Sequence, residues 1–254
     1  MTELNHRQAA PSRATMALRV VPLALLLVIF IAAVGRPGSV PESTRPKTTT
    51  RPAPIALAHF STLPPGSNLP TGAWCSRHVR QSSWEPRPEN FTPNHTTGYH
   101  LYYIEGANET ARLKFGQRVD GNFTGTTDEI LQWGACKWGF DEDVVRAVAV
   151  TQSWWNQSTV GGDGESFGLL QVKCHVEGIC PGARDSTAFN VDYALAWQRT
   201  CYEGYFDWIP ARSRGEKWGC IRLWFSGTWQ ANSGKYIRTV KRHLRQKTWL
   251  DPDF

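Results

Sequence analysis

The sequence predicts a mainly α fold with a small β element, held together by disulfide bonds. Successive segments of the C-terminal half place apolar residues at helical spacing between residues that start and stop helices. A glycine-rich turn and the short apolar run "GLLQV" interrupt these segments and predict the β element. Six cysteines all lie after residue 70, and an even number in an exported chain favours three disulfides among fifteen possible pairings.

The first long helix is predicted for residues 126–139. Thr126 followed three residues later by Glu129 is a capping box, in which each side chain bonds the other residue's backbone N–H. Gly139 provides the stop, because glycine readily adopts the left-handed conformation that ends helices.

A second helix is predicted to begin after Asp141, whose carboxylate can cap it, and to end near residue 153. Val145, Val148 and Gln152 follow at spacings that place them on one helix face. Gln152 is therefore expected to point inward with the valines. Two interpretations stay open: a core amide bonded to neighbouring backbone, or a catalytic position at the floor of a cleft.

The strand "GLLQV" at 168–172 is followed by a loop between cysteines and a long helix that opens at residue 185. Shorter helices are predicted over 216–227 and 233–247. In the last helix an apolar stripe faces the core, and a basic outer face either binds wall phosphates or carboxylates or is simply solvated. The basic face consists of Lys235, Arg238, Lys241, Arg242 and Arg245.

The N-terminal quarter indicates export. Residues 1–35 combine arginines with an uncharged apolar run of about 22 Å in helical form, shorter than a bilayer core of about 30 Å. This predicts a signal peptide or a signal-anchor, with membrane contact only through that segment. Residues 36–70 carry half of the prolines and read as a tether. Residues 71–125 form a loop-rich arm with one strand-like run, "YHLYYI", and residues 126–254 form the main domain.

The charge and the cysteines limit the partners. A net charge of +6 and a pI near 9.1 favour anionic surroundings. No nucleic-acid-binding motif accompanies that charge, so nucleic acid is not expected as a partner. A zinc site with His78 or His175 is the alternative to disulfides, but no C-x-x-C pair supports it, and we expect neither metal nor cofactor.

Residues 141–247 resemble the lysozyme-like domain of soluble lytic transglycosylases and goose-type lysozymes, in a secreted bacterial form. Four motifs occur in the family's order. A helix ends in "QS" where the family has Glu-Ser, and "GLLQ" stands where it has Gly-Leu-Met-Gln. "WFSG" is similar to its Ala-Tyr-Asn-Ala-Gly segment, and Tyr236 lies where it places a tyrosine.

The resemblance implies a two-lobed domain that binds peptidoglycan glycan strands and cuts the bond between N-acetylmuramic acid and N-acetylglucosamine. Its acid position falls on Gln152. The residues implied in substrate binding are Ser153, Trp155, Gly168, Leu169, Gln171, Ser226, Trp229 and Tyr236. Trp155 and Trp229, beside polar neighbours, are expected in the groove, whereas Phe167 and Trp224 are expected in the core.

Gln152 departs from the family, because an amide cannot deliver a proton. Three interpretations follow. Another carboxylate replaces the acid, with Glu165 the first candidate and Asp163 the second; or the domain is a tethered glycan-binding pseudoenzyme; or Gln152 is a recent change in an otherwise catalytic chain. We expect an exported, wall-facing peptidoglycan glycosidase of the lytic transglycosylase or lysozyme type, with the tethered glycan-binding pseudoenzyme as the alternative.

Overall fold

The computed structural model describes residues 60–162, 164–174 and 178–254. The predictions for residues 1–59, and those on Asp163 and His175, lie outside these residues. The described chain is mainly helical with one small sheet, as the sequence predicts. No helix in the described ranges combines the length and apolar character needed to cross a membrane.

The five predicted helices are present, in the predicted order. The α-helices are α1 (Gly72–Ser76), α2 (Phe91–Asn94), α3 (Glu109–Phe115), α4 (Thr127–Trp138), α5 (Glu142–Ser153), α6 (Cys180–Asp185), α7 (Thr187–Glu203), α8 (Lys217–Ser226) and α9 (Gly234–Gln246). The predicted helices are α4, α5, α7, α8 and α9, whereas α1, α2, α3 and α6 were not predicted. Short 3-10 turns cover Pro88–Asn90, Gly116–Arg118, Ala211–Ser213 and Thr248–Leu250. The strands β1 (Val160–Gly161), β2 (Ser166–Phe167) and β3 (Val172–Lys173) form an antiparallel sheet in that order.

The caps of the two central helices are confirmed. Thr126 and Glu129 form both bonds of the capping box of α4, and Gly139 ends the helix at φ +62°. Asp141 caps α5 by accepting from the backbone N–H groups of Asp143 and Val144, each at 3.0 Å. These caps fix where α4 stops and α5 starts.

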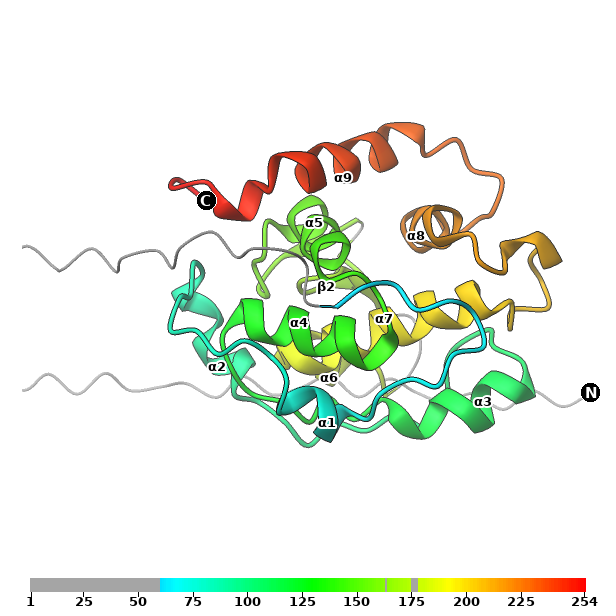
Figure 1. Ribbon diagram of the computed structural model, residues 1–254, viewed down its shortest axis with the longest axis horizontal. Helices are drawn as coiled ribbons and strands as arrows, with labels where there is room; N and C mark the ends of the chain where they lie inside the picture. Colours follow the sequence, from blue (N-terminus) through cyan, green and yellow to red (C-terminus); the bar gives the residue numbers. More distant parts are fainter. Residues whose placement is uncertain (1–59, 163, 175–177) are drawn as a thin grey trace, which may run out of the picture. The chain divides into compact units, whose positions relative to one another are not determined.

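The core forms where α4, α5 and α7 meet; α9 packs on α5, and α8 packs on α7 and α9 (Figure 1). Large aromatic side chains fill much of this core, including Trp133, Trp138 and Trp155, which are all fully buried. Burying such rings contributes strongly to folding because each removes a large apolar area from water. α9 contributes Tyr236, Val240 and His243 as its buried residues, while Ile237 and Leu244 of the predicted stripe are half-buried.

All six cysteines form disulfides. The pairs are Cys75–Cys136, Cys174–Cys180 and Cys201–Cys220. The first joins the arm to α4, the second joins β3's end to α6, and the third joins α7 to α8. No group of three possible metal-ligating side chains lies within the described parts of the chain.

Three local predictions are wrong. Residues 60–70, predicted as tether, pack on the domain: the Arg199 guanidinium donates to the carbonyls of Leu63 and Pro64 at 3.0 and 2.9 Å. The run 99–104 forms no strand. Its backbone makes a single hydrogen bond across to another described segment, from Leu101 N–H to the Val119 carbonyl, and not the repeated hydrogen bonds of a β-ladder. In "GLLQV", residues 168–171 form a turn, and only the valine enters β3.

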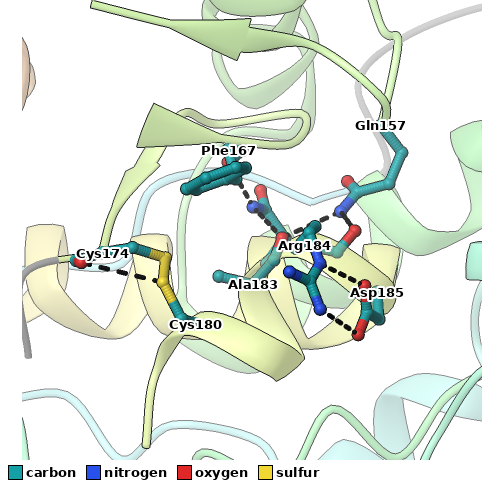
Figure 2. Close-up of a disulfide and its surroundings, with 8 residues drawn as sticks. Gln157, Phe167, Cys174, Cys180, Ala183, Arg184 and Asp185 are labelled. Atoms are coloured by element: carbon teal, nitrogen blue, oxygen red, sulfur yellow. Dashed lines mark hydrogen bonds and ion pairs between the residues drawn. A yellow bond between two sulfur atoms is a disulfide. The ribbon is translucent and has the colours of Figure 1, made fainter. Parts of the chain in front are cut away.

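Buried amides hold that turn in place. The Asn190 side chain accepts from Leu170 N–H at 2.9 Å and donates to the carbonyls of Phe167 and Ala183. Gln157 accepts from Leu169 N–H at 3.1 Å. It also donates to the carbonyls of Ala183 and Arg184 in α6, as Figure 2 shows beside the Cys174–Cys180 disulfide. The turn therefore depends on side chains from α7 and from the segment after α5.

We expect Gly168→Ala to lower the free energy of unfolding by about 1–3 kcal/mol. Gly168 has φ +78°, and a Cβ there would overlap the amides of Asn190 and Gln157. Gly164→Ala is the matched control, since Gly164 has φ +92° but open space around its Cβ position. Urea unfolding of both variants measures the difference. Equal losses would show that the amide contacts do not restrict residue 168.

Candidate functional site

A groove of about 930 Å³ lies where the end of α5, the sheet, α7 and α8 come together. This volume suits a small ligand or a short stretch of a polymer. Its lining comprises Glu105, Gly106, Thr151, Gln152, Gly161, Gly162, Ser166, Gln171, Lys173, Tyr193, Trp197, Trp208, and Leu223 to Gly227 of α8 and its cap. Residues from the arm to α8 thus build one surface.

Gln152 lies at the groove, half-buried in the last turn of α5. Its Nε2 donates to the Tyr236 hydroxyl of α9 at 2.9 Å. Burial raises the pKa of Tyr236 far above its ordinary value, with the bond from Gln152 opposing that shift, so the hydroxyl stays neutral in ordinary buffers. The amide is therefore held by a neutral partner and carries no proton to give.

Ser153 and Gln171 hold the turn that follows β2. Ser153 Oγ donates to the Leu169 carbonyl at 2.9 Å, which ties the helix to the turn after β2. Gln171, at φ +53°, donates from Nε2 to the carbonyls of Gly168 and Thr159. This arrangement places the amides of residues 152 and 171 along the same groove.

Aromatic rings form another part of the groove lining. The Trp197 ring lies 5.3 Å from that of Trp224 and 6.5 Å from that of Trp208. The indole N–H groups of Trp208 and Trp224 donate to the carbonyls of Gly106 and Leu170, which fixes both rings. Phe225 stacks on Tyr236 at 4.1 Å, and Trp208 and Phe225 remain about half exposed, at 52% and 53%. The groove thus offers fixed rings to a ligand.

Glu105, in the arm, carries the one carboxylate among the described groove-lining residues. The Tyr193 hydroxyl bonds the backbone of Glu105, and burial together with the Glu105 charge raises the pKa of Tyr193. Glu105 thus lies beside a neutral phenol and in the same groove as the Trp208 ring.

Three of the residues selected from the sequence line the groove: Gln152, Gln171 and Ser226. The other selected residues that the structure describes lie outside its lining. Glu165 is half exposed and pairs with Lys173 at 3.2 Å, so no contact brings it to the end of α5. Ser153, Trp155, Gly168, Leu169, Trp229 and Tyr236 are buried beneath or beside the groove. Two of the six bond lining residues directly: the Tyr236 hydroxyl accepts from Gln152, and the Gly168 carbonyl accepts from Gln171.

Trp155 and Trp229 are core residues, contrary to expectation: Trp155 is fully buried and donates to the Arg146 carbonyl. Trp224, expected in the core, lines the groove. Sequence reasoning missed Glu105, Tyr193, Trp197, Trp208 and Phe225. Among these residues only Phe225 had a signal in the sequence, since it lies within the "WFSG" motif. No sequence pattern indicates that Glu105 of the arm lies in the groove.

No protein-family model, curated protein or solved structure matches this chain. The chemistry of the groove is therefore the main guide to function.

Proposed function

We propose that this chain binds the glycan strands of peptidoglycan in the groove, and that it does not cut them by the route of the lytic transglycosylases. One observation carries the proposal. Gln152, at the position of the family's acid, lies in the groove and is bonded to Tyr236. An amide preserves the shape and hydrogen bonding of a glutamate while removing the transferable proton.

The groove lining suits a sugar chain. Sugar rings present C–H faces that pack on aromatic rings, and their hydroxyl and acetamido groups exchange hydrogen bonds with amides and hydroxyls. Trp208 and Phe225 offer half-exposed rings, and Gln152, Gln171 and Ser166 offer polar groups in the same groove. The mixture of fixed apolar surface and a few polar groups is typical of small-molecule sites.

The order of motifs in the sequence supports the choice of glycan. The four segments whose residues resemble the transglycosylase motifs lie at the end of α5, in the turn 168–171, at the end of α8 and at the start of α9. Each of these segments contributes to the groove or directly supports it. We therefore favour a peptidoglycan strand over an unrelated sugar polymer.

Co-sedimentation with purified sacculi tests binding. We expect Trp208→Ala and Phe225→Ala each to weaken binding by about tenfold, because each removes one stacking ring. Trp74→Ala is the matched control, since Trp74 of α1 is 40% exposed but does not line the groove. If both groove variants sediment like the native protein, the groove is not the glycan site.

Cleavage with a different acid is a second candidate function, favoured by the position of Glu105 in the groove. In this mechanism the Glu105 carboxyl donates its proton to the glycosidic oxygen and the C–O bond breaks. Water then adds to the anomeric carbon and returns a proton to the carboxylate. Release of soluble muropeptides by the native protein, abolished by Glu105→Gln but not by Glu165→Gln, would favour this candidate over binding alone.

A further inference from the structure

The outer side of α9 carries a basic face whose residues are not part of the groove lining. The face consists of Lys235, Arg238, Lys241, Arg242 and Arg245. Four of these side chains are exposed and Lys241 is half-buried. At 100° per residue they fall within about one third of the helix circumference, opposite Tyr236 and Val240. Along the axis they extend over about 15 Å.

These five cations have no acidic partners in the part of the chain that the structure describes. The buried basic side chains of the core are paired, in contrast: Lys137 with Asp192, Arg146 with Asp128, and Arg199 with Glu203. α9 itself contains no aspartate or glutamate. The basic face is therefore an uncompensated patch.

The arrangement is unfavourable for the helix alone. Arg238 and Arg242, and Lys241 and Arg245, are like charges at i,i+4, which destabilise a helix. Lys235 and Arg238 lie near the N-terminus, where the helix dipole is already positive. α4 and α5, in contrast, have acids in their first turns. Helix stability therefore does not account for the basic face.

The patch continues onto the start of α8. Lys241 Nζ lies 4.7 Å from the centre of the Trp218 ring, and Lys217 Nζ lies 5.6 Å from the same ring. The extent of the patch fits a linear polyanion better than a single small anion, because one small anion cannot contact cations spread along the whole helix. Three arginines favour phosphate groups, which guanidinium binds through paired hydrogen bonds.

We propose that the α9 basic face binds a phosphodiester-linked anionic polymer attached to the cell wall. The identity of the wall as its setting rests on the proposed function, whereas the affinity for phosphodiester chains does not. In this proposal the groove binds the glycan strand of the cell wall, and the basic face binds the anionic polymer attached to that wall.

The test compares the full chain on two forms of the same sacculi, with the phosphodiester polymer attached and after its chemical removal. We expect tighter binding to the polymer-bearing form at low salt, with the difference disappearing at about 0.5 M salt, where charges are strongly screened. The triple variant Arg238→Gln, Arg242→Gln, Arg245→Gln should lose that difference, with affinity falling about tenfold to a hundredfold.

The matched control is Arg77→Gln, Arg112→Gln, Arg212→Gln, which removes the same charge from exposed positions outside α9. An equal loss in both triple variants, equal binding to the two sacculi, or tighter binding to duplex DNA than to the polymer would overturn the proposal. Trp208→Ala separates the two proposals. It should weaken binding to polymer-free sacculi, while the gain from the polymer stays intact.

Discussion

Gln152→Glu is expected to raise the release of soluble muropeptides from purified sacculi by about a hundredfold to ten-thousandfold, the usual contribution of a positioned general acid. The groove needs no rearrangement for this change. The Tyr236 hydroxyl, which accepts from the Gln152 amide at 2.9 Å, can accept from the protonated carboxyl group of the introduced glutamate in the same way. The partly buried site also disfavours the charged form of a carboxyl group, which favours a proton donor.

Mass analysis of the released fragments measures the effect. Gln171→Glu is the matched control, because it adds the same charge to another amide of the groove, one that bonds Gly168 and Thr159 and not Tyr236. A native protein that already cuts, and that gains less than a few-fold from Gln152→Glu, would contradict the binding proposal. Glu105→Gln then becomes the decisive variant.

Lys137→Met should lower the free energy of unfolding by about 3–5 kcal/mol, the usual loss when one partner of a buried ion pair is removed. Lys137 Nζ lies 2.8 Å from Asp192 Oδ2 and 2.9 Å from Asp120 Oδ1, and the Lys137 and Asp192 side chains are almost inaccessible to water. Asp192 also accepts from the Trp138 indole and from the backbone of residues 120 and 121. The variant leaves the buried Asp192 carboxylate without its cation.

Chemical denaturation followed by tryptophan fluorescence measures this loss. Lys235→Met, at an exposed lysine without an ion pair in the described chain, should change stability by less than about 0.5 kcal/mol. The double variant Lys137→Met, Asp192→Asn should lose less than the sum of the single changes, because the two charges interact directly. Additive losses would mean that the pair contributes little to the fold.

The local features of the fold could be predicted from the sequence. The capping box at Thr126 and Glu129, and the cap at Asp141, involve side chains that bond backbone groups two or three residues away. The face shared by Val145, Val148 and Gln152 follows from helix geometry alone. Such features need no knowledge of the rest of the chain.

The β element was only partly predictable. "GLLQ" looks like a strand because its residues are apolar, but Asn190 and Gln157 satisfy its backbone groups from outside any sheet. These partners lie 12 to 20 residues away in the sequence. A buried turn of this kind can replace a strand wherever side-chain amides supply the missing hydrogen bonds.

By itself, the sequence determined the helical class and the order of the long helices, because each of these depends on neighbours within one or two helical turns. The amide at residue 152 is likewise read directly from the sequence. Only the tertiary structure decided the disulfide pairs, the burial of Trp155 and Trp229, and the meeting of Glu105 and Trp208 with the end of α5. Those outcomes depend on contacts between segments far apart in the chain, where packing selects among arrangements that local sequence leaves equally possible.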